Sequence, residues 1–125
     1  MIDVRSDIDK KFDKDLKNLT SIENSMIEKK LNLLIDLMRE QKSTLHHLSM
    51  IHKFHYGADM DSSLYALRVN KDLRIILSSE EDPLFNEHIL TLLRVVKHVD
   101  LDKTFRRIGE SLNQSFLNNG GIQNG

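Results

Sequence analysis

The sequence predicts an α+β domain in which an N-terminal helical hairpin packs on one face of a small antiparallel sheet and a short C-terminal helix follows. Apolar residues first recur at helical spacing, then alternate as in strands, and finally form a second, shorter helical stripe. With 125 residues, 39% hydrophobic and 30% charged, the chain has the composition of one globular domain. We therefore expect a single domain over residues 1–116 and a disordered polar tail over residues 117–125.

The first third of the chain carries two helical stripes, after a short strand expected over residues 2–5. The first stripe recurs at i, i+4, i+8 and i+11 and consists of Ile8, Phe12, Leu16 and Leu19. The second helix opens at a capping box, in which the Thr20 hydroxyl covers a free amide and Glu23 reaches back. Its buried stripe consists of Ile27, Leu31, Leu34 and Met38. Because almost no loop separates the two helices, we expect them to pack antiparallel.

Residues 64–78 alternate like a β-hairpin whose loop is residues 70–72. One face becomes wholly apolar when the strands pair Tyr65, Leu67 and Val69 with Leu77, Ile75 and Leu73. The same register sets Arg68 opposite Arg74 on the other face, although like charges directly opposite destabilise a pair. A slip of one residue would separate the arginines but would turn each apolar set away from the core. The apolar face therefore forces the two arginines together.

Two guanidinium groups directed at one place predict a bound anion, and phosphate suits their forked donors best. The alternative is that Arg68 and Arg74 pair with carboxylates, for which Asp72, Glu80 and the first helix are the candidates.

Residues 88–98 predict a third strand, apolar on both faces at first, as a central strand would be. Strict alternation would put on one face His88, Leu90, Leu92, Arg94, Val96 and His98. A charge in an apolar strand is costly, so Arg94 must either reach an exposed face or pair with a carboxylate. Asp100 is expected to cap a last helix that ends near residue 112. We expect the helices to cover one sheet face and the basic side chains to lie on the other.

Composition limits the classes of function. There is no run of eighteen apolar residues and no signal-peptide pattern, so we expect a cytoplasmic protein that does not contact membranes. Cysteine is absent, and the spacing of the histidines at 46, 47, 52 and 55 matches no standard zinc pattern, so we expect neither metal nor cofactor. A net charge of −1 counts against nucleic-acid binding, but the strands gather basic residues on one face.

Four segments, taken in order and spacing, resemble the RelE/ParE superfamily of bacterial type II toxins: residues 12–19, 64–70, 73–77 and 93–98. The resemblance covers about residues 1–108. It implies a RelE-like fold and a metal-independent endoribonuclease that cuts mRNA on the translating ribosome and so inhibits translation. The implied reaction is attack of a ribose 2′-hydroxyl on its own phosphate, which needs a base, an acid and cationic donors. The implied partners are the ribosome, mRNA and a cognate antitoxin that covers the basic face or displaces the last helix.

The resemblance also implies roles for residues at matching positions. Arg68, Arg74 and Arg94 match arginines on the open sheet face that bind the scissile phosphate, and His98 matches a position for proton transfer. Further substrate contacts are expected from Lys53, His55, Lys71, Phe105 and Arg106.

The chain departs from the family pattern in two ways. Phe105 stands where many members carry a tyrosine, and phenylalanine stacks on a base but moves no proton, so that role would pass to His98, His55 or Tyr56. The near-neutral charge is also unusual for a ribosome ligand. A second hypothesis therefore stays open, in which the chain is a non-catalytic binding protein, either a ParE-like gyrase inhibitor or an inactive toxin homologue.

Overall fold

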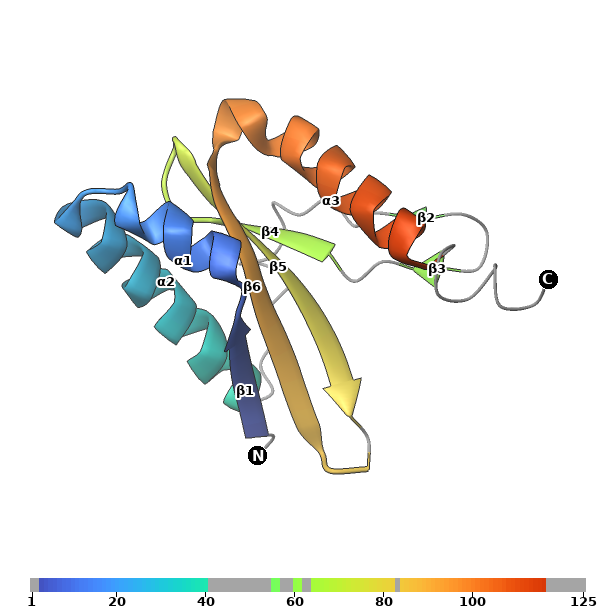
Figure 1. Ribbon diagram of the computed structural model, residues 1–125. Helices are drawn as coiled ribbons and strands as arrows, with labels where there is room; N and C mark the ends of the chain where they lie inside the picture. Colours follow the sequence, from blue (N-terminus) through green and yellow to red (C-terminus); the bar gives the residue numbers. More distant parts are fainter. Residues whose placement is uncertain (1–2, 41–54, 57–59, 62–63, 83, 117–125) are drawn as a thin grey trace.

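The computed structural model describes residues 3–40, 55–56, 60–61, 64–82 and 84–116 (Figure 1). The elements follow in the order β1 (Asp3–Ile8), α1 (Lys10–Lys17), α2 (Ser21–Arg39), β2 (His55–Tyr56), β3 (Met60–Asp61), β4 (Leu64–Arg68), β5 (Leu73–Asp82), β6 (Glu87–Lys97), a 3₁₀ turn (His98–Asp100) and α3 (Leu101–Phe116). None of the described helices is long and apolar enough to cross a membrane. The predicted tail, residues 117–125, lies outside the described residues.

Four strands form the main sheet in the order β1-β6-β5-β4, and β2 pairs with β3 in a separate ribbon. β4, β5 and β6 are antiparallel neighbours, as expected, but β1 runs parallel to β6. The sheet is therefore mixed, and the predicted wholly antiparallel sheet is wrong at this edge. The α+β class is confirmed. Local periodicity indicates a strand but carries no information on the direction of its distant partner.

β1 is also longer than expected, because it continues through Ile8, which the sequence placed in the first helical stripe. Ile8 pairs with Leu92 and is 61% exposed. α1 begins only after Asp9, whose carboxylate accepts a hydrogen bond from the Lys11 N–H at 2.8 Å. This N-cap fixes the point at which the extended chain becomes helical.

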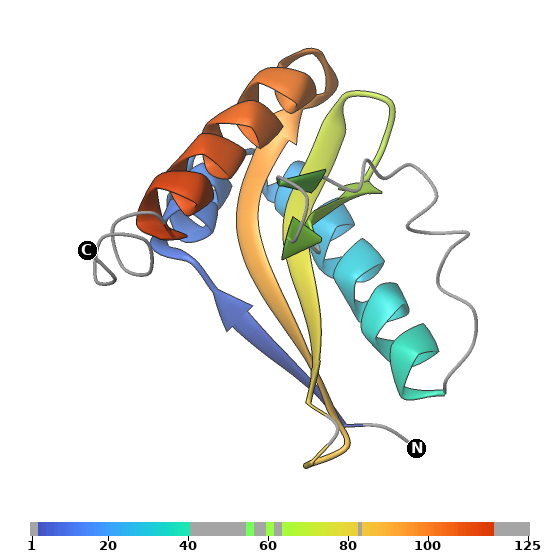
Figure 2. The same cartoon turned by 90° about the vertical axis from the view of Figure 1, so that its right-hand side faces the viewer.

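Helices cover both faces of the sheet (Figure 2). α1 and α2 supply Phe12, Ile27, Leu34 and Met38 to a core on one face. α3 packs Leu101 and Phe105 against the other face in a second core. The expectation of helices on one face only is therefore wrong. The apolar stripe of α3 needs a surface to cover, and the outward residues of the strands supply one: Leu64, Ala66, Ile76 and Val96. α1 and α2 share one face, whereas their antiparallel packing as a hairpin stays a prediction.

The predicted hairpin register is confirmed: Tyr65 lies opposite Leu77, Leu67 opposite Ile75, and Arg68 opposite Arg74. The Asn70 side-chain oxygen accepts the Asp72 and Leu73 N–H groups, both at 2.8 Å, and so closes the loop.

β6 does not alternate strictly. The register between β5 and β6 shifts by one residue. Ile76 pairs with Arg94 and Leu77 pairs with Leu92, so Leu93 has no opposite residue on β5. Leu92 consequently belongs to the α1/α2 core and Leu93 packs against the α3 core. This bulge overturns the predicted shared face of β6, since one extra residue reverses the side-chain alternation beyond it.

The capping box of α2 is formed as the sequence predicts. Thr20 Oγ1 accepts the Glu23 N–H at 3.1 Å, and Glu23 Oε1 accepts the Thr20 N–H at 3.0 Å. We expect Thr20→Ala to lower the free energy of unfolding by about 1 kcal/mol, measured by urea denaturation. Ser25→Ala, at an exposed position of the same helix, is the matched control and should cause no loss. Equal losses in the two variants would contradict the role of the cap.

Candidate functional site

Four predicted site residues lie at one end of the sheet, and one of them, Lys71, is in the loop between β4 and β5. Arg68 ends β4, and Arg74 lies opposite it near the start of β5. On the next strand Val96 lies opposite Arg74, and His98 follows two residues later, where its N–H donates to the Asp72 carbonyl at 2.7 Å. We call this region, made of Arg68, Lys71, Arg74 and His98, the arginine end.

Arg74 is buried, at 8% exposure, although its side chain is charged. Its Nη1 donates to the carbonyl oxygens of Asn70 and, at 2.9 Å, of Leu73. Burial lowers the pKa of Arg74 from its ordinary value, the charge of Arg68 lowers it further, and Asp72 acts in the opposite direction. The cation is thus held by backbone dipoles beside a second cation, an arrangement that a bound anion would stabilise.

Arg68 is exposed, and no carboxylate in the described part of the chain forms an ion pair with it or with Arg74. Glu80, one of the acids considered from the sequence, lies six residues beyond Arg74 on β5. That separation along a strand is roughly 20 Å. Among the described residues, the alternative in which Arg68 and Arg74 are neutralised by ion pairs is therefore not realised.

Arg94 has a different environment, because its guanidinium is bound by Asp15 of α1. Arg94 Nε lies 2.7 Å from Asp15 Oδ2, and Nη2 lies 3.2 Å from Oδ1. Asp15 Oδ2 also accepts the Val95 N–H at 2.9 Å. The hydrogen bond to Asp15 raises the pKa of Arg94, against a smaller lowering by burial. Of the two alternatives for Arg94, the carboxylate partner is the one observed.

The position of Asp15 follows from the end of β1. β1 pairs with β6 only as far as Leu92, and beyond it α1 runs alongside β6. The Asp15 carboxylate then takes the place of a strand partner for the Val95 N–H. Asp15 was missed by the sequence reasoning. The one sequence feature that could have indicated Asp15 is its position next to Leu16 of the apolar stripe. A carboxylate in such a position is common on amphipathic helices.

Within the arginine end, Lys71 and His98 are exposed. The remaining predicted residues lie elsewhere, and of these Arg106 is exposed on α3. Phe105 is fully buried in the α3 core, so its ring is not available to stack on a base. His55 lies in β2, a strand whose side chains are not described, and Lys53 lies outside the described residues. Within the described ranges, no three His, Cys, Asp or Glu side chains gather as a metal site would require.

A polar hollow of about 670 Å³ lies beside Arg94, between α1 and α3. Its lining carries charges of both signs: Asp15, Glu23, Arg94, Lys97, Asp100, Lys103 and Arg107. Because the signs are mixed, the hollow does not by itself define a ligand.

No protein-family model and no curated protein matches the sequence. Solved structures do match. The chain is similar to YafQ from E. coli strain BL21(DE3), with 17% identity over 81% of this chain and 98% of that chain and a TM-score of 0.50. It is also similar to a chain of the E. coli DinJ-YafQ toxin-antitoxin complex, with 16% identity over 80% and 98% of the chains and a TM-score of 0.50. At this identity the likeness shows the fold alone, which is that of YafQ.

Asp15→Ala should destabilise the protein, because it leaves Arg94 and the Val95 N–H without their shared acceptor. Asp15 and Arg94 are 17% and 32% exposed, so we expect a loss of about 1–3 kcal/mol in urea denaturation. Asp13→Ala on the same helix is the control, since Asp13 forms only an exposed pair with Lys17 at 3.6 Å. That loss should be at most about 0.5 kcal/mol. Similar losses from both substitutions would show that the Asp15 contacts contribute little.

Arg68→Glu should raise stability while removing anion binding. A glutamate at this position would face Arg74 across the strand pair, which converts a repulsive pair into an attractive one worth about 0.2–1 kcal/mol. Lys71→Glu makes the same charge change in the adjoining loop without facing Arg74 across the strand pair, and is the control for stability only, because Lys71 itself belongs to the arginine end. Urea denaturation measures stability, and titration with inorganic phosphate measures binding. A loss of stability in Arg68→Glu relative to Lys71→Glu would contradict the repulsion between Arg68 and Arg74.

Proposed function

We propose that this protein is the toxin of a type II toxin-antitoxin system and acts as a ribosome-dependent mRNA endoribonuclease. The observation that carries the proposal is the arginine end, where the core-determined register holds Arg68 directly opposite Arg74. The RelE/ParE-like fold supports the same assignment, because the compared structures include a toxin-antitoxin complex.

The proposed chemistry needs cations at the phosphate and groups that transfer protons. Exposed Arg68 would donate to the nonbridging oxygens of the scissile phosphate, while buried Arg74 would add its charge from behind. Such donors stabilise the charge that develops when the 2′-hydroxyl attacks phosphorus. His98, exposed at the same end, would take or return a proton, with Lys53 or His55 as the second group and Lys71 and Arg106 as further RNA contacts.

Two predicted roles change in this proposal. Arg94 is bound to Asp15, so its part would be to hold α1 against β6 instead of binding phosphate. Phe105 supports the packing of α3 and does not stack on RNA.

The proposed partners are the ribosome, mRNA and a cognate antitoxin. The antitoxin is supported by the DinJ-YafQ complex, in which a chain of similar fold is present with its antitoxin. An enzyme that acts on translating ribosomes works in the cytoplasm, which is where we place it.

A second candidate function is binding without catalysis, as in a ParE-like inhibitor of DNA gyrase or an inactive toxin homologue. Specific observations favour it: Arg94 is neutralised by Asp15, Phe105 is buried, and the net charge is −1. The Asp15 partner of Arg94 and the negative net charge reduce the cationic character that an RNA-cleaving site requires, and the buried Phe105 offers no ring to stack on a base.

A reconstituted translation reaction separates the two functions. The wild type should cleave mRNA, and Arg68→Ala should reduce the rate by about 100-fold or more, as expected for loss of one donor to the developing charge. His98→Ala should reduce it by about 100-fold or more through lost proton transfer. Lys29→Ala, at an exposed position on α2, is the control and should cleave normally.

Supercoiling by DNA gyrase is assayed in parallel. Intact mRNA together with inhibited supercoiling would replace the nuclease proposal with the second candidate. If mRNA stays intact and gyrase is unaffected, the result would support the inactive toxin homologue.

A further inference from the structure

The polar hollow beside Arg94 lies where β6 loses its parallel partner. β1 pairs with β6 only as far as Leu92, and beyond that point the hollow opens between the end of α1, the end of β6 and the start of α3 (Figure 1). We call it the β6 hollow. Its volume of about 670 Å³ is within the range of known ligand pockets. The charges of its lining that are not already engaged within the fold decide what it can bind.

Most of the acids in the β6 hollow are engaged. The Asp15 carboxylate is bound to Arg94 and to a backbone N–H of β6. Glu23 Oε1 accepts the Thr20 N–H at 3.0 Å as part of the capping box. Asp100, the remaining acid of the lining, is exposed, and its carboxylate forms no ion pair within the described residues. Asp100 is therefore the one acid of the hollow whose charge is not engaged.

The cations of the β6 hollow, Arg94 apart, are not engaged. Lys97, Lys103 and Arg107 are exposed, and none of them forms an ion pair in the described part of the chain. Lys103 and Arg107 are four residues apart on α3, so they lie on the same side of the helix. Three such cations against one acid give the hollow a positive net charge, which favours an anionic ligand.

The backbone of β6 adds a hydrogen-bond donor. The Val95 N–H points away from β5 and donates to Asp15. The His98 N–H points the other way and donates to the Asp72 carbonyl. Because successive residues of a strand direct their N–H groups to opposite sides, the Lys97 N–H lies on the same side as that of Val95, where the hollow opens. In the described part of the chain it has no acceptor.

A phosphate ester matches these groups better than a carboxylate does. At neutral pH a phosphate monoester carries about 1.5 to 2 negative charges and three strong acceptor oxygens. Those oxygens can accept the forked donors of Arg107, the ammonium group of Lys103 and the Lys97 N–H together. Leu19 and Leu73 also line the hollow and provide apolar surface for the organic part of the ester.

We propose that the β6 hollow binds a small phosphate ester of mononucleotide size, with its phosphate held by Arg107, Lys103 and the Lys97 N–H. The hollow lies on the side of β6 that faces α1, whereas Arg68 and Arg74 lie on β4 and β5, beyond the other side of β6. The inference therefore concerns a second anion site and does not depend on RNA cleavage.

The probe is adenosine 5′-monophosphate (AMP), titrated into the full-length ¹⁵N-labelled protein, with adenosine and inorganic phosphate as comparisons. We expect AMP to shift the amides of Lys97, Lys103 and Arg107. Adenosine should not bind, and inorganic phosphate should bind about threefold to tenfold more weakly than AMP, because it gains nothing from the apolar surface. The amides of residues 70–74 report the arginine end and are fitted separately.

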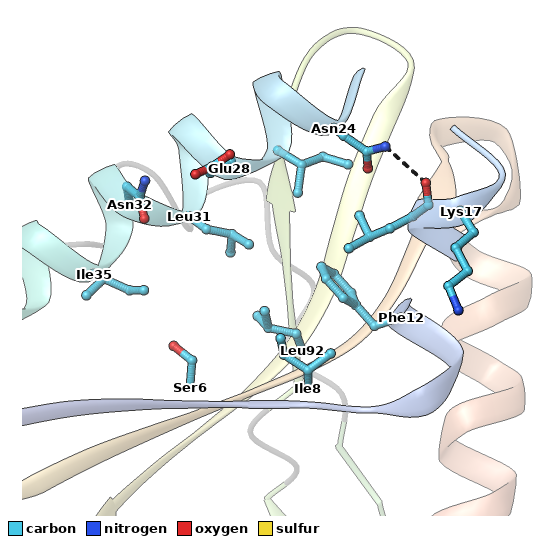
Figure 3. A pocket seen from close by; sticks show the side chains of 12 residues that line it. Ser6, Ile8, Phe12, Lys17, Asn24, Glu28, Leu31, Asn32, Ile35 and Leu92 are labelled. Atoms are coloured by element: carbon cyan, nitrogen blue, oxygen red, sulfur yellow. Dashed lines mark hydrogen bonds between the residues drawn. The ribbon is translucent and has the colours of Figure 1, made fainter. Parts of the chain in front are cut away.

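Arg107→Ala should weaken AMP binding by about fivefold to tenfold, because it removes the forked donor. Lys17→Ala is the matched control for the loss of a cation. Lys17 is at the end of α1 but lines the separate, largely apolar groove between β1 and α2 that Figure 3 shows, so this variant should bind AMP normally.

Asp100→Asn should tighten AMP binding by about twofold, because it removes the one acid of the hollow that is not engaged. A gain in affinity cannot result from damage to the fold. Asp102→Asn makes the same charge change at an exposed position outside the hollow and should leave the affinity unchanged.

Adenosine binding as tightly as AMP, or AMP shifts confined to the arginine end, would overturn the site. Equal affinity for AMP and inorganic phosphate would overturn the ester, and equal gains in Asp100→Asn and Asp102→Asn would overturn the local role of Asp100. The last comparison is a short RNA. If RNA binds the hollow about tenfold more tightly than AMP and loses that advantage in Arg68→Glu, the hollow extends the arginine end and the proposed small ligand is wrong.

Discussion

The packing of the β4–β5 hairpin under α1 and α2 is the constraint on which the arginine end depends. Leu67, Ile75 and Leu77 are almost completely buried on the helix side, and a slip of one residue would expose them. Burying each aliphatic side chain contributes about 1.5–3 kcal/mol, whereas the opposed arginines cost at most about 1 kcal/mol. The core therefore determines the register, and the proximity of Arg68 and Arg74 is its consequence. The carbonyls of Asn70 and Leu73 reduce the cost of burying Arg74.

A second constraint acts where β1 ends. Beyond Leu92, β6 loses its parallel neighbour, and α1 lies beside it with Asp15 bound to both Arg94 and the Val95 N–H. The Val95 N–H on this side of β6 needs an acceptor because Val95 is buried. Where β1 has ended, the Asp15 carboxylate on α1 provides that acceptor. This arrangement separates the three arginines into two kinds: Arg94 is satisfied within the fold, whereas Arg68 and Arg74 have no carboxylate partner in the described part of the chain.

Features that depend on local sequence were predictable, and features that depend on distant partners were not. The hairpin register and the Thr20–Glu23 capping box follow from residues within a few positions of each other, and both are confirmed. The parallel direction of β1, the leftover Leu93 and the packing of Phe105 on the second sheet face are set by segments far apart in the chain. Alternation predicts that a strand exists, but it cannot show a one-residue bulge inside a segment that is apolar on both faces. For the candidate site, Arg68, Arg74, Arg94 and His98 were predicted together, whereas Arg94 is bound to Asp15, a residue that the prediction missed.

The charged and polar groups that have no partner within the described residues differ in kind between the arginine end and the β1 edge. At the arginine end the uncompensated charge is positive, which suits a phosphate. At the β1 edge Asp3, Asp7 and Glu87 outnumber Arg5, so the surface charge is acidic, and the unpaired buried atom beside the apolar groove, Asn24 Oδ1, is an acceptor. A polyanion would be repelled from the acidic surface at the β1 edge and attracted to the exposed Arg68. The charge distribution therefore makes the arginine end, and not the β1 edge, the more favourable surface for a phosphate.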